Sequence, residues 1–198
     1  MHGLAGQHHA AGVHLGVPGK AVQKLRHVEG GFVGLLIDGQ IPVLRAGGQG
    51  WLELGNHVEA DKELEKIAPQ LRNHPDFLEI RWSIRSLQKN WEACVDIANA
   101  LMGADPDRVT GRVRLSFALH ELTRTEEAYI NLAAVCDDFP HEWVVPYNLA
   151  CYCSQLGELA EAKEWFKKSI AIDDKAATKA GIDDPDLKPL WESMYTPI

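Results

Sequence analysis

Cys151 and His120 are of residue types that could support nucleophilic catalysis. A cysteine attacks as its thiolate, and a histidine assisted by an acid such as Glu121 could remove the thiol proton. The two residues are far apart in the sequence, so the fold would have to bring them together. Cys153 follows Cys151 closely, but residues i and i+2 of a helix point about 200° apart, so the two thiolates could not face one metal ion.

The N-terminal segment holds a second set of candidate ligands, four histidines among the first fourteen residues. Imidazoles bind divalent metal ions, but no cysteine or carboxylate lies nearby at ligand spacing, so we expect only weak, adventitious binding. The glycines of Gly30-Gly31-x-x-Gly34 lack the spacing of a G-x-G-x-x-G phosphate loop. The sequence therefore predicts no metal site, no cofactor and no enzymatic activity.

Composition and charge limit the classes of function. The 198 residues carry a net charge of −8, with 28 acidic and 20 basic residues, which argues against binding to nucleic acid. No apolar run approaches the ~18 residues of a membrane span, and no secretory signal is recognisable, so we expect a cytoplasmic protein that does not bind membranes. The four cysteines are too few and too irregular for a disulfide framework and are expected to be reduced.

The chain changes character at about residue 50. The first fifty residues contain 12 of the 17 glycines but only 2 of the 28 acidic residues. We expect residues 1–49 to be an atypical leader, which is either poorly structured or the result of a wrongly assigned start upstream of the true one. The alternative is a hairpin over residues 32–45, where Asp38-Gly39 is a strong turn signal between two apolar runs.

The remainder of the chain, which must position Cys151 and His120, contains a repeat of about 34 residues. Apolar residues recur at this period, as in Leu115, Leu119 and Leu122 and then Leu149, Cys153 and Leu156. Within each copy the apolar spacing is 3, 4 or 7, which predicts helices rather than strands. Ala128 and Ala162 also correspond, and small residues there would let two antiparallel helices approach closely.

This helix-turn-helix pattern resembles the tetratricopeptide repeat (TPR) family. The best matches are Trp51-Leu-Glu-Leu-Gly55 and residues 149–157. Arg81 and Cys153 depart from the family pattern, where a small residue and an aromatic residue are usual. The resemblance implies an all-α fold, a right-handed superhelix of antiparallel helix-turn-helix repeats.

The repeat also divides the chain. Beyond the leader, we expect a TPR array over residues 50–174 and, over residues 175–198, capping helices that cover the last repeat. The array is expected to consist of a partial repeat over 50–73 and full repeats over 74–107, 109–142 and 143–174.

In the TPR family the first helices of stacked repeats line a concave groove, and the resemblance places a set of residues there. They are Leu78, Glu79, Trp82, Arg85, Val113, Arg114, Phe117, His120, Tyr147, Asn148, Cys151 and Gln155. Trp82, Phe117 and Tyr147 form an aromatic ladder with arginines between, which is typical of a peptide-binding surface. One branch of the family clamps a C-terminal carboxylate, but its lysine and second asparagine are missing here, so an extended segment with apolar anchors and one acidic group fits better.

The sequence therefore predicts a non-catalytic adaptor that binds a partner protein or peptide in this groove. One alternative is a structural module that self-associates through the groove or through an uncovered N-terminal helix face. The other is an enzyme that uses Cys151 and His120.

Overall fold

The described part of the chain is helical. The computed structural model describes residues 50–52 and 54–195, and within these ranges no β-strand occurs. Residues 50–52 are helical, and the longer helices are α2 (His57–Glu65), α3 (Pro75–Leu87), α4 (Trp91–Ala104), α5 (Thr110–Glu121), α6 (Thr125–Ala133), α7 (Val144–Leu156), α8 (Leu159–Ile172), α9 (Asp174–Gly181) and α10 (Lys188–Tyr195). Short 3-10 turns lie at Pro69–Leu71, Cys136–Asp138 and Pro185–Leu187. The expected leader over 1–49 and the alternative hairpin over 32–45 lie outside the described residues.

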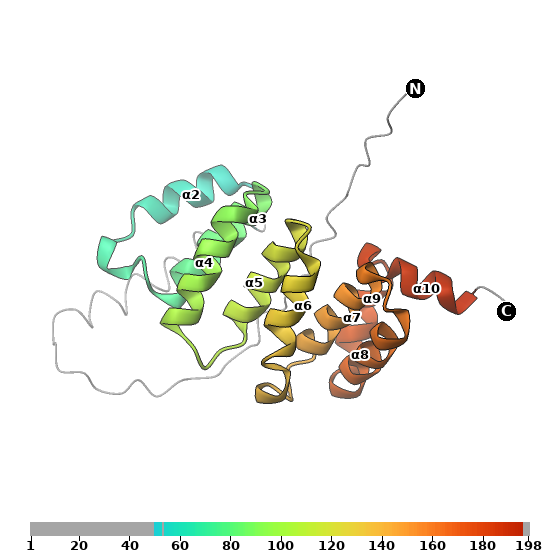
Figure 1. The fold of residues 1–198 in the computed structure, drawn as a ribbon. Helices are drawn as coiled ribbons and strands as arrows, with labels where there is room; N and C mark the ends of the chain where they lie inside the picture. Colours follow the sequence, from blue (N-terminus) through green and yellow to red (C-terminus); the bar gives the residue numbers. More distant parts are fainter. Residues whose placement is uncertain (1–49, 53, 196–198) are drawn as a thin grey trace, which may run out of the picture.

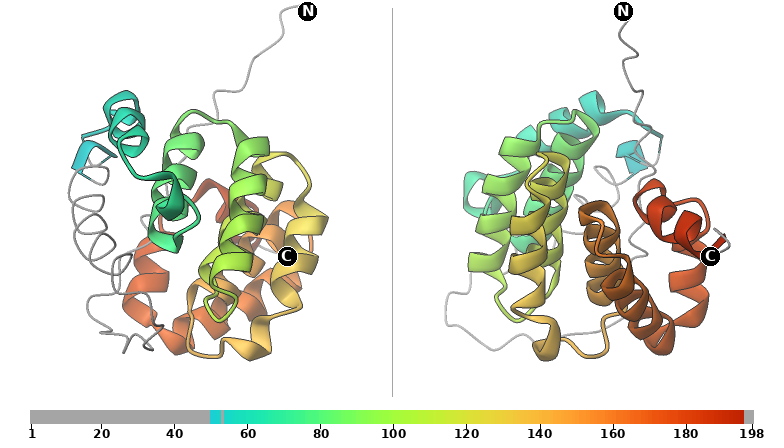
Figure 2. Two further views of the ribbon diagram at one scale, coloured as in Figure 1. Left: turned by 90° about the vertical axis from the view of Figure 1, so that its left-hand side faces the viewer. Right: turned by 45° about the vertical axis from the view of Figure 1, so that its right-hand side comes forward.

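Consecutive helices pack as antiparallel hairpins (Figure 1). α3 pairs with α4, α5 with α6, and α7 with α8, and neighbouring hairpins meet through α4 with α5 and α6 with α7. α2 packs against α3 at one end of the row, while α9 and α10 pack against α8 at the other. Figure 2 shows the hairpins stacked one after another. The prediction of an all-α, TPR-type helical solenoid is confirmed.

The turn that joins the two helices of a hairpin has the same backbone geometry each time. Its left-handed residues are Gly55, Lys89, Thr123 and Gly157, with φ of 71°, 54°, 61° and 82°. Each of them lies 34 positions after the one before. The next residue donates its N–H to a carbonyl five positions earlier, as from Asn90 to Arg85 at 2.9 Å, which closes the first helix in a Schellman motif. The 34-residue period of the sequence is therefore also a period of the backbone.

The hydrophobic core runs along the solenoid in two clusters. The first lies between α2, α3 and α4 and includes Leu64 and Ile84. The second surrounds α7, whose residues 144–154 are all buried. Ala128 and Ala162 are fully buried, as expected for small residues between closely packed helices. α7 is thus the central helix of the C-terminal half. Whether its predicted groove residues are exposed depends on which elements pack over them.

Candidate interaction site

The first helices of the hairpins, α3, α5 and α7, lie next to one another and form what we term the inner face. The ring centroids of Trp82 on α3 and Phe117 on α5 are 6.0 Å apart, in an edge-on arrangement. The rings of His120 on α5 and Tyr152 on α7 are 5.2 Å apart. Every groove residue predicted from the sequence lies on one of these three helices.

The predicted groove residues differ in their exposure. Those that are at most 8% exposed are Leu78, Trp82, Val113, Tyr147, Asn148 and Cys151. Glu79, Arg85, Arg114, Phe117 and His120 are half-buried, and Gln155 is exposed. Of the expected aromatic ladder, Phe117 alone reaches the surface. Trp82 and Tyr147 are part of the core, because other side chains of the described residues cover them.

Ion pairs hold two of the predicted groove residues of α3, Arg85 and Glu79. The Arg85 guanidinium contacts the Asp61 carboxylate of α2 through Nη1 at 3.0 Å and Nη2 at 3.3 Å. This two-point contact joins α2 to the first hairpin. Glu79 lies 3.5 Å from the guanidinium of Arg108, at the start of the next hairpin. Arg85 and Glu79 therefore link α3 to neighbouring elements, and both side chains are also partly exposed.

Arg114 lies between α3 and α5, stacked on an aromatic ring. Its guanidinium carbon is 4.1 Å from the centroid of the Trp82 ring, a cation–π contact. The Nε atom of Arg114 and the Nε1 atom of Trp82 are both buried, and within the described part of the chain neither has a hydrogen-bond partner. Burial lowers the pKa of the Arg114 guanidinium, against the opposing effect of Glu79. The Phe117 ring packs edge-on against the rings of both Trp82 and Trp91, beside the stacked Arg114 guanidinium.

The chain itself covers the α7 part of the inner face. After α9 the backbone returns to α7, where the Tyr147 hydroxyl donates to Oδ2 of Asp184 at 2.5 Å and the Cys151 thiol lies 3.9 Å from the same oxygen. Burial raises the pKa of the Asp184 carboxyl, and the hydrogen bond from Tyr147 partly opposes that shift. Burial is also the main reason that the pKa of Tyr147 is raised above its ordinary value.

Asp186 continues this contact toward α5. Its carboxylate lies 3.3 Å from Nε2 of His120, and its backbone carbonyl accepts a hydrogen bond of 2.9 Å from the Gln155 side chain. The other ring nitrogen of His120 lies 3.0 Å from the Thr125 hydroxyl. Residues 184–186, which we term the acidic turn, thus contact Tyr147, Cys151 and Gln155 of α7 and His120 of α5. The sequence indicated a cap here, but nothing in its spacing predicted that the cap returns onto the inner face.

The arrangement does not activate Cys151 as a nucleophile. Burial, reinforced by the carboxylates of Asp184 and Asp186, raises the pKa of the Cys151 thiol well above its ordinary value. A thiol in this environment stays protonated and is a poor nucleophile. Both ring nitrogens of His120 face other groups, so the pairing of Cys151 with His120 that catalysis would require is not formed.

Metal-binding side chains are not grouped in the described ranges. No set of three or more His, Cys, Asp or Glu side chains there is arranged to hold a metal ion. Cys94, Cys136, Cys151 and Cys153 are free thiols. The N-terminal histidines lie outside the described residues.

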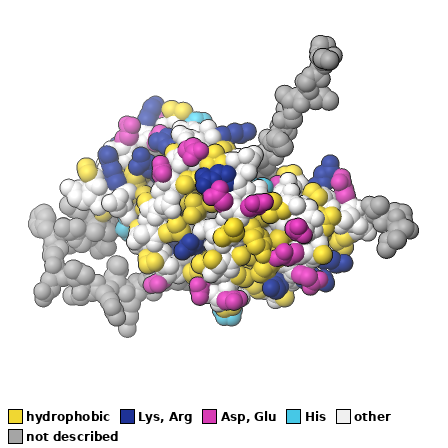
Figure 3. Space-filling model, viewed as in Figure 1, with side chains coloured by type: hydrophobic (Ala, Val, Ile, Leu, Met, Phe, Trp, Pro, Cys, Tyr) yellow, Lys and Arg dark blue, Asp and Glu magenta, His cyan; other side chains and the backbone are white. Residues whose placement is uncertain are grey.

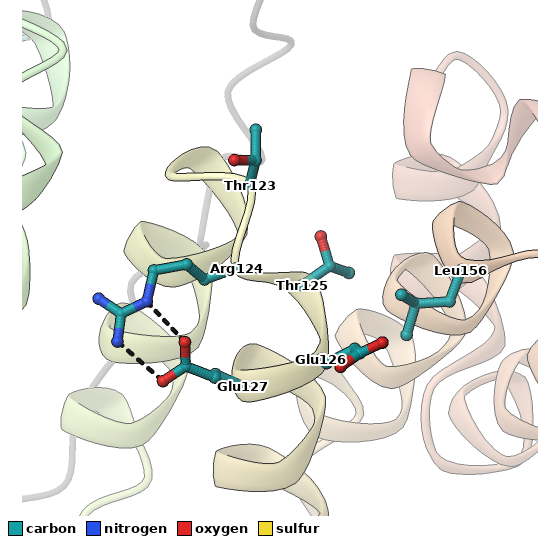
Figure 4. A pocket seen from close by; sticks show the side chains of 6 residues that line it. All are labelled: Thr123, Arg124, Thr125, Glu126, Glu127 and Leu156. Carbon is teal, nitrogen blue, oxygen red and sulfur yellow. Dashed lines mark hydrogen bonds and ion pairs between the residues drawn. The ribbon is translucent and has the colours of Figure 1, made fainter.

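A surface depression of about 350 Å³ lies where the α5–α6 turn faces the end of α7 (Figure 4). It is lined by Thr123, Arg124, Thr125, Glu126, Glu127 and Leu156. The Arg124 guanidinium forms a two-point contact with the Glu127 carboxylate, at 2.7 and 2.8 Å. Because its arginine is already paired, the depression offers little to bind a charged ligand.

Apolar and charged side chains share the surface outside the inner face. Figure 3 shows hydrophobic side chains gathered in the middle of one face, with acidic and basic side chains interspersed around them. Large apolar side chains that are more than half exposed include Leu54, Val58, Ile130 and Ile182. Among the described helices, none has the length and apolar character needed to cross a membrane.

Solved structures of MamA proteins have a similar helical arrangement. The structure "MamA MSR-1 C2" is 21% identical over 69% of this chain and 78% of its own, with a TM-score of 0.55. "MamA 41-end from Desulfovibrio magneticus RS-1" is 17% identical over 80% of this chain and 98% of its own, with a TM-score of 0.56. No protein-family model and no curated protein sequence matches the chain. At these identities the likeness establishes a shared fold, the TPR-type helical solenoid.

Proposed function

We propose that this chain is a non-catalytic TPR-type interaction module that binds a short segment of a partner protein on its inner face. The observation that carries the proposal is the acidic turn, which lies across α7 and α5. There, Tyr147 and His120 contact the carboxylates of Asp184 and Asp186, and Gln155 donates to the Asp186 backbone carbonyl. A surface that holds such a segment within its own chain has side chains suited to hold a similar one from another protein.

The partner segment would lie on α3 and α5, because the acidic turn covers α7. Phe117 supplies an apolar anchor at the surface, and Arg114 supplies an orienting polar group. This combination of an aromatic anchor with an arginine is typical of the residues that contribute most binding energy in protein interfaces. The raised pKa of the Cys151 thiol argues against the alternative in which this cysteine is a catalytic nucleophile.

Site-specific photo-crosslinking tests the proposal on the full chain. Phe117 is replaced by p-benzoylphenylalanine, which keeps an aromatic side chain, and the matched control carries it at Asn99, an exposed residue of α4. We expect irradiation in cells to produce a discrete adduct from position 117 and not from position 99. The same adducts from both positions, or none from either, would contradict binding on the inner face.

Self-association is a second candidate function, favoured by the apolar surface near α2. Leu54 and Val58 are 76% and 52% exposed, although both are large apolar side chains. A second copy of the chain could cover them. Sedimentation velocity at increasing concentration separates the two functions. A dimer that dissociates in the Val58→Glu variant would support self-association, and a monomer throughout would exclude it.

A further inference from the structure

Polar side chains of the inner face are paired with acidic residues of the same chain. Such pairs are Arg85 with Asp61, Tyr147 with Asp184, and His120 with Asp186. Arg114 differs from them, because its Nε atom is buried without a hydrogen-bond partner among the described residues, and its guanidinium is stacked on the Trp82 ring. Among the described residues, Arg114 is therefore an inner-face cation that no carboxylate contacts directly, although Glu79 is near enough to oppose the fall in its pKa.

The surroundings of Arg114 make the absence of a directly contacting carboxylate energetically unfavourable. Nε of Arg114 is buried, and the carboxylate on the adjoining helix, that of Glu79, contacts Arg108 at 3.5 Å instead. A guanidinium remains charged in proteins, and a buried charge without a partner lowers stability. The Trp82 ring beneath it holds the planar group in one orientation but offers no hydrogen-bond acceptor.

We propose that Arg114 is a recognition site for the side-chain carboxylate of an Asp or Glu within the partner segment. This inference rests on the proposed function and names the chemistry of the partner. A carboxylate would accept hydrogen bonds from the guanidinium in the two-point geometry that Arg85 and Asp61 already form on the same face. The stacking on Trp82 holds the Arg114 guanidinium in one orientation before the ligand binds, so that less side-chain entropy is lost on binding.

The acidic turn is an example of a continuous segment that contacts the inner face through side-chain carboxylates, and we expect the same of the partner segment. Asp184 and Asp186 lie in the middle of a chain, and both contact the inner face through their side chains. A partner segment on α3 and α5 would lie on the same face, with its acid at Arg114. Next to the acid we expect an apolar residue, because Phe117 is only half-buried and packs beside the stacked pair.

Two immobilised peptide pools test the inference with the full chain. Both consist of 12-residue peptides with amidated C-termini and random flanking positions, and they differ only in a central Glu or Gln. The proteins compared are the wild type, Arg114→Met, Arg114→Lys and a control, Arg81→Met, which removes an exposed arginine of α3. Thermal unfolding followed by circular dichroism checks that each variant is folded.

We expect the wild type to retain the Glu pool at least tenfold more tightly than the Gln pool, as for a charge-assisted two-point contact. Arg114→Met should lose this preference while still binding both pools, Arg114→Lys should keep part of it, and Arg81→Met should keep all of it. If the wild type binds both pools equally, the carboxylate site is wrong although the proposed function stands. If no pool is bound, the proposed function fails with it.

Discussion

The left-handed turn residues allow a test of the solenoid that depends on the backbone alone. Gly157 has φ of 82°, and a Cβ atom built there would meet no atom within 4 Å. Gly157→Ala therefore introduces backbone strain without a steric clash. A left-handed conformation costs an L-residue about 1–2 kcal/mol, so we expect the free energy of unfolding to fall by about 1 kcal/mol.

Thr123 occupies the equivalent position one repeat earlier, with φ of 61°. A β-branched residue is strained in this conformation, so Thr123→Gly should relieve about 1–2 kcal/mol of strain. Glycine also makes the unfolded chain more flexible, which costs about 0.4–1 kcal/mol. The net result should be an increase of about 0.5 kcal/mol in the free energy of unfolding.

Gly103 supplies the matched control, because it lies in helix α4 and a Cβ there would also meet nothing within 4 Å. Gly103→Ala should stabilise the protein by up to about 1 kcal/mol through helix propensity. Urea unfolding followed by circular dichroism measures all three variants, and 1 kcal/mol corresponds to a midpoint shift of about 0.5 M. If Gly157→Ala raises the midpoint as Gly103→Ala does, the left-handed turn geometry is wrong.

Other expected outcomes concern the inner face. The buried Asp184 carboxyl has a raised pKa, so its contribution to stability is greatest at low pH, below the unfolded-state value, and is lost as pH rises through the folded-state value. Asp184→Asn should flatten that loss in urea unfolding measured between pH 3 and pH 7, and an unchanged pH profile would contradict it. Cys151 should react with iodoacetamide at pH 8 only at the rate of unfolding, because burial raises the pKa of its thiol. Mass spectrometry follows the reaction, and rapid alkylation of the folded protein would reopen the catalytic alternative. The partly exposed Arg85–Asp61 pair should contribute no more than about 1 kcal/mol in a double-mutant cycle, and less at high salt, so a larger coupling energy would show that the pair is better shielded from solvent.

The fold could be predicted because a solenoid repeats its constraints. Ala128 and Ala162 indicated where helices approach closely, and the apolar spacing indicated which faces they bury. The left-handed turns could be predicted at Gly55 and Gly157 from glycine itself. They could not be predicted at Lys89 and Thr123, where contacts elsewhere in the hairpin impose the conformation on residues that do not favour it.

The site was harder to predict, because membership of a helix face does not determine exposure. The resemblance placed Trp82 and Tyr147 on the inner face, and both helices do form that face. Trp82 is nevertheless covered by a residue of the same face, Arg114, and Tyr147 by Asp184. These contacts join segments that are distant in the sequence, so the local spacing contained no signal for them.

The return of the cap onto α7 also limits what a partner can be. With the acidic turn in place, a partner segment of the proposed kind would cross α3 and α5 only. Packed helices lie about 8–10 Å apart, so such a segment spans about 20 Å, or about six extended residues. A contact this short has room for one apolar anchor and one charged group, which Phe117 and Arg114 would receive. Specificity would then depend on the fixed orientation of the Arg114 guanidinium on Trp82 more than on the area of contact.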